Sequence, residues 1–107
     1  MTPKLETFAE IVAQANDQFM DKHKLVNTLI GIMDKALRQQ GMAADAITID
    51  AVELNKKIVF LLRDLDDTSV EVALGNKAGD IHDTTQYQLA DLDISMVINI
   101  MEESLIS

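Results

Sequence analysis

The chain has 107 residues, of which 48% are hydrophobic and 4% aromatic, and its formal net charge is −9. This length fits one domain and the apolar content excludes a disordered chain, so we expect a single domain over residues 1–107 with an aliphatic core. The absence of cysteine excludes disulfides and thiolate zinc sites. With only His23 and His82 as further nitrogen ligands, we expect neither a metal nor another cofactor.

The negative charge lies in the second part of the chain. Through Ala44 there are five basic and five acidic residues, whereas from Asp45 onward there are four basic and thirteen acidic ones. Nucleic-acid phosphates and anionic lipids would repel such a surface, so we expect no nucleic-acid or membrane partner. The chain also has neither an apolar run of about 20 residues nor a secretory signal pattern at its start, which predicts a cytoplasmic protein.

The first forty residues have a helical pattern. Thr2 and Pro3 are typical of a helix start, and Gly41 is typical of a residue that follows a helix. In between, residues at alternating spacings of three and four form a seam: Leu5, Phe8, Val12, Ala15, Phe19, Lys22, Val26, Leu29, Met33 and Ala36. Two arrangements fit this seam, namely a helical hairpin that breaks near residues 20–24 and one long helix that packs on a partner chain.

The second half of this segment carries more apolar residues than one helix face can bury. Leu25, Ile30, Ile32 and Leu37 widen the apolar stripe around the seam. This surplus predicts burial on more than one side. We therefore expect the protein to self-associate through its N-terminal helices as a homodimer, or to bind another protein there.

After a connector at residues 42–46 the apolar period changes to two, which predicts an antiparallel meander of three to four strands. The strand segments are 47–51, 57–64, 69–75 and 81–89, with turns near Asn55-Lys56, Asp66-Asp67 and Asn76–Gly79. The continuous apolar run 58–62 is typical of a central strand buried on both faces. An alternative is a helix over 51–65, because Asp50 and Glu53 imitate a capping box.

The C-terminal segment predicts a helix that begins after Asp93 as cap and buries Ile94, Val97, Met101 and Leu105. Carboxylates near its end, at Glu102 and Glu103, oppose the helix dipole for no reason visible in the sequence. The predicted fold class is α+β: N-terminal helical hairpin or one long helix, small antiparallel sheet, C-terminal helix.

The string Asp64-Leu65-Asp66-Asp67-Thr68 resembles the nucleophile motif of the haloacid-dehalogenase phosphotransferases. The resemblance implies Asp64 as nucleophile and Asp66 as acid/base, with Mg²⁺ between them. That family builds a parallel sheet, and each parallel crossover takes a dozen or more residues. The possible counterparts of its later motifs, Lys77 and the acids of 79–83, follow within twenty residues of Asp64. We therefore expect a turn between two antiparallel strands, and no catalytic residue.

We thus expect a non-catalytic protein-interaction or regulatory module, with no catalytic, cofactor-binding or metal-binding residue and no small-molecule substrate. One alternative is an acidic adaptor or inhibitor that binds a basic protein, which requires the thirteen carboxylates to gather on one face. A second alternative is a phosphotransferase-like enzyme that uses Asp64 and Asp66.

Overall fold

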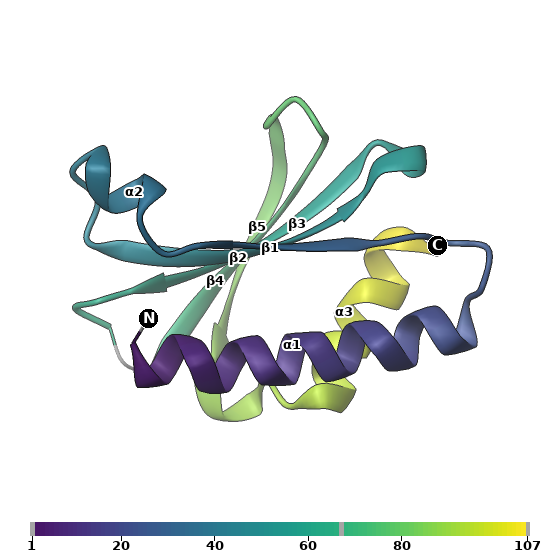
Figure 1. Ribbon diagram of the computed structural model, residues 1–107, viewed down its shortest axis with the longest axis horizontal. Helices are drawn as coiled ribbons and strands as arrows, with labels where there is room; N and C mark the ends of the chain where they lie inside the picture. Colours follow the sequence, from purple (N-terminus) through teal and green to yellow (C-terminus); the bar gives the residue numbers. More distant parts are fainter. Residues whose placement is uncertain (1, 67, 107) are drawn as a thin grey trace.

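A computed structural model describes residues 2–66 and 68–106 as one five-stranded antiparallel sheet with two helices against one of its faces (Figure 1). In chain order the elements are α1 (Pro3–Lys22), β1 (Leu29–Met33), α2 (Ala36–Gln39), β2 (Ala44–Ala51), the 3-10 turn η1 (Val52–Leu54), β3 (Lys56–Arg63), β4 (Ser69–Gly75), β5 (Ile81–Gln88), the 3-10 turn η2 (Leu89–Asp91) and α3 (Ile94–Leu105). The strands lie in chain order across the sheet. The predicted α+β fold is confirmed, with five strands in place of three to four.

The first helix begins and ends where the sequence indicates. The Thr2 side chain accepts a hydrogen bond from the backbone N–H of Leu5 at 3.2 Å, and Pro3 occupies the first helical position. The first half of the predicted seam, from Leu5 to Phe19, is buried. Phe8 packs edge-to-face on Phe60 of β3, with ring centroids 5.4 Å apart. The apolar stripe of α1 is therefore covered by the chain's own sheet.

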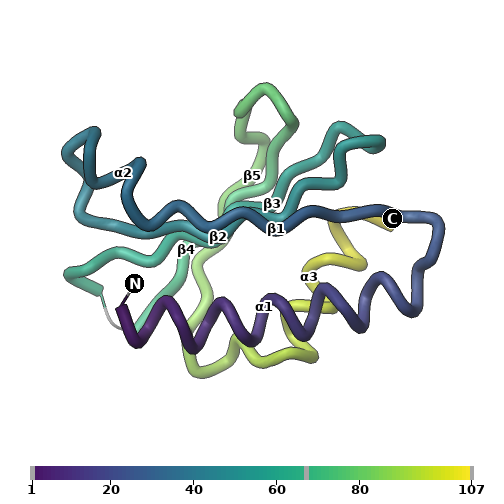
Figure 2. The backbone as a smooth tube through the Cα atoms, viewed as in Figure 1, coloured from purple at the N-terminus to yellow at the C-terminus, as the bar shows by residue number. Residues whose placement is uncertain are grey.

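The predicted second helix, or continuation of the first, is wrong for residues 23–35. This segment leaves α1 at His23 and forms β1, which pairs with β2 from Leu29 opposite Asp50 to Met33 opposite Ala46. Two β-branched residues around a glycine favour a strand, and β1 supplies the hydrogen-bond partner that β2 would otherwise lack on that side. In Figures 1 and 2, β1 crosses in front of the other strands and runs above α1. Only the four-residue α2 follows it.

Three of the other four strands match the predicted segments, β2 begins earlier, at Ala44 within the predicted connector 42–46, and the turns lie where expected. Asn55, at φ 53°, turns the chain between β2 and β3, and Gly79, at φ +97°, turns it between β4 and β5. The predicted turn at Asp66-Asp67 joins β3 to β4, although Asp67 lies outside the described residues. The alternative helix over 51–65 is wrong, because only η1 is helical there.

The central strand is buried on one face and half-buried on the other. Ile58, Phe60 and Leu62 of β3 are buried under the helices, whereas Val59 and Leu61 keep part of their surface exposed. The prediction that this strand is buried on both faces is therefore wrong. The reason is that α1 and α3 both lie on one side of the sheet, while only α2 lies on the other (Figure 1).

The C-terminal helix confirms its predicted start and explains the carboxylate of Glu102 near its end. Asp93 caps α3 by accepting a hydrogen bond from the backbone N–H of Met96 at 2.9 Å. Glu102 lies 2.7 Å from the Lys22 ammonium and 2.8 Å from Nε2 of His23. Glu102 thus joins the C-terminal end of α1 to α3, and this tertiary contact offsets its unfavourable position along the helix dipole.

Candidate functional site

The two outer strands of the sheet differ in chemistry. Of the five strands in the described chain, β1 is the one whose sequence, Leu-Ile-Gly-Ile-Met, contains no ionisable side chain. The other outer strand, β5, is almost wholly polar, is exposed along most of its length and carries Asp83. Outer strands present unpaired N–H and C=O groups, and charged or polar side chains commonly protect them from pairing with other chains. The edge of β1 lacks that protection.

Large apolar side chains around β1 are exposed to solvent. Leu29 is 65% exposed and Ile32 is 43% exposed, and Leu25, in the segment that leads into the strand, is 93% exposed. Val52 and Leu54 of η1 are also exposed. We call β1 together with Leu25, Val52 and Leu54 the β1 surface; it is an outer strand with apolar side chains at and beside it.

Hydrogen bonds hold the segment before β1 in place. The hydroxyl of Thr28 donates to the carboxamide oxygen of Asn16 on α1, and both side chains are buried. The Asn27 side chain donates to Glu53 of η1 at 3.3 Å, which joins the start of β1 to the turn that carries Val52 and Leu54. The apolar surface is thus presented by an anchored strand.

Close packing also fixes β1 against β2. A Cβ atom at Gly31 would lie 2.7 Å from Oγ1 of Thr48, the residue opposite it on β2. Thr48 is buried and its side chain is β-branched, so it has little freedom to move aside. Glycine at this position therefore lets β1 approach β2 in the observed register.

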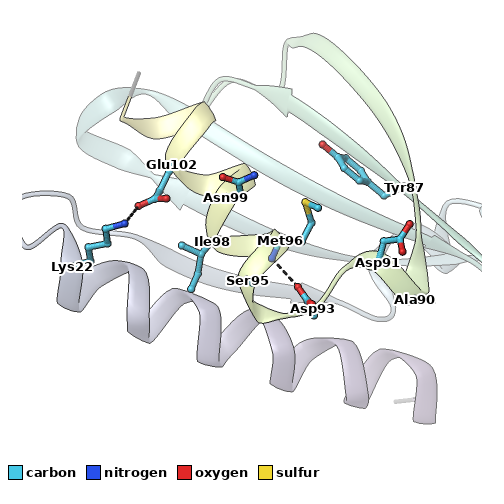
Figure 3. A pocket seen from close by; sticks show the side chains of 10 residues that line it. All are labelled: Lys22, Tyr87, Ala90, Asp91, Asp93, Ser95, Met96, Ile98, Asn99 and Glu102. Carbon is cyan, nitrogen blue, oxygen red and sulfur yellow. Dashed lines mark hydrogen bonds and ion pairs between the residues drawn. The ribbon is translucent and has the colours of Figure 1, made fainter.

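A second candidate surface lies between α3 and the end of β5. A groove of about 680 Å³ is lined by Lys22, Tyr87, Ala90, Asp91, Asp93, Ser95, Met96, Ile98, Asn99 and Glu102. Figure 3 shows Tyr87 and Asp91 on the side of β5 and η2, and Met96 and Asn99 on the side of α3. A further cavity of about 250 Å³ shares Tyr87 and is lined by Asp83 and Glu103 among others. We call these two cavities together the α3 groove.

The α3 groove is acid-rich. Its lining includes five carboxylates, Asp83, Asp91, Asp93, Glu102 and Glu103, and one lysine, Lys22. That lysine is already held by Glu102 (Figure 3). The hydrogen bond from His23, followed by that from Lys22, keeps the pKa of Glu102 below its ordinary value, so this carboxylate stays ionised.

Four carboxylates elsewhere in the second part of the chain form ion pairs with cations. Arg38 binds both Asp45 and Asp64, at 2.9 and 2.6 Å. Other pairs lie on neighbouring strands: Lys57 with Asp50 at 3.6 Å and Arg63 with Glu71 at 3.0 Å. The carboxylates of residues 45–66 and 68–106 therefore lie in several parts of the molecule.

The two acids of the phosphotransferase-like string have structural partners. Arg38 donates two hydrogen bonds to Asp64, and they hold the pKa of that carboxyl below its ordinary value. Asp66 accepts hydrogen bonds from the hydroxyl and backbone N–H groups of Thr68 and Ser69, led by the Ser69 hydroxyl, and its pKa falls to about 2. Both acids therefore belong to the connection between β3 and β4.

Among the described residues, no group of three or more histidine and acidic side chains is arranged to hold a metal ion. His23 is half-buried beside Glu102, and His82 lies exposed on β5. Within the same residues, no helix combines the length and the apolar character needed to cross a bilayer.

Comparison of the chain with protein-family models, with curated proteins and with solved structures gave no match.

Sequence reasoning identified the apolar surplus of residues 25–37 but assigned it to a helix, and so missed the outer strand. The pattern that could have revealed β1 is Ile30-Gly31-Ile32, since glycine weakens a helix interior and isoleucine favours a strand. Four of the five carboxylates of the α3 groove, Asp91, Asp93, Glu102 and Glu103, lie close together in sequence, whereas Asp83 joins them only through the sheet.

Proposed function

We propose that the protein is a non-catalytic protein-interaction module that binds an extended polypeptide segment along the edge of β1. The observation that carries this proposal is the uncharged outer strand with Leu25, Leu29 and Ile32 exposed. In this mode of recognition, backbone hydrogen bonds to the edge supply affinity and alternate side chains supply selectivity.

The β1 surface suits this role because it combines backbone groups that are free to pair with exposed apolar side chains. The outer edge of β1 offers backbone groups that β2 does not use, since β1 pairs with β2 on one side only. Leu29 and Ile32 lie on opposite faces of the strand, so a bound segment meets an apolar side chain on each face.

The sequence predicts self-association through the N-terminal helices; in this proposal the contact is made by β1 instead. The stripe of α1 from Leu5 to Phe19 is buried within the chain and is not free to contact a second copy. The apolar surplus that motivated the prediction remains exposed in Leu25, Leu29 and Ile32.

A short strand-forming peptide tests the proposal. The probe is a dye-labelled peptide of alternating valine and threonine, and the control is the same peptide with every second amide N-methylated, in both alternating patterns. We expect saturable binding of the first peptide and weak binding of the N-methylated form that blocks the paired edge. The variant Ile32→Lys should lose the binding, whereas Thr84→Lys on β5 should retain it. Equal binding by Ile32→Lys, or by both N-methylated forms, would contradict the proposal.

The spread of the carboxylates does not meet the requirement set for an acidic adaptor that uses one whole face, but the α3 groove favours a narrower second candidate function, binding of a basic protein segment at this groove alone. The favouring observation is its lining of five carboxylates and one lysine, beside the apolar side chains of Met96 and Ile98. Oligolysine is a suitable probe, and Asp91→Asn and Asp83→Asn, each made alone, should weaken its binding more than Glu71→Gln, which removes a carboxylate paired with Arg63. If the three substitutions weaken binding equally, the attraction is only that of the net charge.

A further inference from the structure

We propose that the segment bound at the β1 surface is β1 of a second copy of this chain. The two strands pair antiparallel about a two-fold axis at Gly31, and the two sheets join into one sheet of twice the number of strands. This inference rests on the proposed function and names its partner. Closed two-fold dimers are the commonest form of self-association, and they require a surface that is complementary to itself.

The sequence of β1 is complementary to itself about Gly31. With Gly31 opposite Gly31, Ile30 of one copy faces Ile32 of the other, and Leu29 faces Met33. Directly opposite side chains lie on the same face of a sheet, so each of these pairs is apolar. Every side chain of β1 thus meets a partner of its own kind.

The residues that flank β1 are also compatible with this pairing. Continuing the register places Thr28 opposite Asp34 and Asn27 opposite Lys35. The Asn27 carboxamide oxygen can accept a hydrogen bond from Lys35, and neither pair brings two charges of the same sign together. Gly31 carries no side chain at the centre, which leaves room for Leu29 and Met33 from both copies to close over the axis.

Charge favours β1 over the other outer strand. Each copy carries a net charge of −9, so two copies repel each other over most of their surfaces. Within residues 29–33 the contact contains no carboxylate, whereas pairing through β5 would bring Asp83 and the carboxylates of the α3 groove of both copies together. Electrostatic repulsion between two copies is therefore weaker when they associate through β1 than through β5.

Engineered cysteines test the register, since the natural chain contains none and each thiol is therefore introduced. Leu29→Cys and Met33→Cys are prepared as separate full-length variants. In a dimer of two copies of the same variant, the two thiols lie at opposite ends of the paired strands and cannot meet. Mixed under mild oxidation, the two variants should form a disulfide between residue 29 of one copy and residue 33 of the other. We expect about tenfold more linked dimer in the mixture than in either variant alone, because a disulfide needs Cα atoms within about 7 Å.

The outcomes separate the inference from the function on which it rests. Equal linking in all three samples, or linking in none while both variants keep the circular dichroism of the parent chain, overturns the pairing about Gly31. Sedimentation of the unmodified chain and of Ile32→Lys provides a second measurement, in which the parent should be a dimer and the variant a monomer. A monomeric parent that still binds the valine–threonine peptide would overturn the inference and leave the proposed function standing.

Discussion

At the scale of single residues, the fold depends on a few polar contacts that join distant parts of the chain. Among the described residues, every buried side-chain nitrogen and oxygen atom has a hydrogen-bond partner. The pair of Asn16 and Thr28 is the one that connects α1 to the segment before β1. Because a buried group without a partner is costly, this pair is a sensitive point of the structure.

The substitution Thr28→Val should destabilise the protein by about 1–3 kcal/mol, because valine keeps the shape of threonine but leaves the Asn16 oxygen without a donor. Urea unfolding measures the loss. Thr28→Ser retains the hydroxyl and serves as the control. A serine variant less stable than the valine variant would show that the methyl group, and not the hydrogen bond, matters here.

The turn at Asp66 predicts a dependence on acid pH. The pKa of Asp66 falls from an ordinary value of 3.8 to about 2, first through the Ser69 hydroxyl. Because the folded pKa is the lower one, this carboxylate stabilises the fold above about pH 4, and the contribution is lost as the pH falls through about 2. The parent and Asp66→Asn should therefore differ in their urea midpoint at pH 5 and converge near pH 2. A difference that stays constant over this range would contradict the role assigned to Asp66.

Single residues of the candidate sites differ in how far their roles could be predicted from the sequence. Asp64 and Asp66 were identifiable as turn residues because an alternating strand follows them directly. The role of Glu102 was not identifiable, because its partners Lys22 and His23 are brought to it by the packing of α1 on α3. Contacts between residues far apart in sequence depend on tertiary packing that a local pattern does not contain.

At the scale of elements, the sequence predicts all but one of the long segments. The alternating segments became β2 to β5, and caps at Thr2 and Asp93 begin α1 and α3. The error lies in β1, where apolar residues spaced three and four apart continue the α1 pattern. A short apolar run fits either period, and pairing with β2, a tertiary effect, decides for the strand.

The register of β1 predicts coupling between Gly31 and Thr48. Gly31→Ala should destabilise the protein by about 1–3 kcal/mol, since the added Cβ meets the Thr48 hydroxyl at 2.7 Å. In the double variant with Thr48→Ala, part of that loss should be recovered, because the second substitution removes the obstructing atom. A double-mutant cycle in urea measures the coupling, and purely additive losses would contradict this register.

At the scale of the whole molecule, the two helices leave the sheet unevenly covered. Two helices about 10 Å wide cover roughly four strands spaced about 4.8 Å apart, so part of a five-stranded sheet stays open. On the helix-covered face this shortfall appears at both margins, as the α3 groove beside β5 and as the exposed side chain of Ile32 on β1. Of these two regions, the β1 surface is uncharged and the α3 groove is acidic, and for this reason we propose different kinds of partner for them.

The most direct test of the central claim, that the edge of β1 binds another strand, is amide hydrogen exchange at several protein concentrations. In a free outer strand about half of the amides point away from the sheet and exchange readily. We expect amide exchange in residues 29–33 to slow over about a hundredfold increase in protein concentration, because by mass action a larger fraction of β1 edges is then paired with a second copy. Exchange in β5 should stay constant. Ile32→Lys should remove this dependence. Exchange in residues 29–33 that is the same at all concentrations and is unaffected by the valine–threonine peptide would contradict the account.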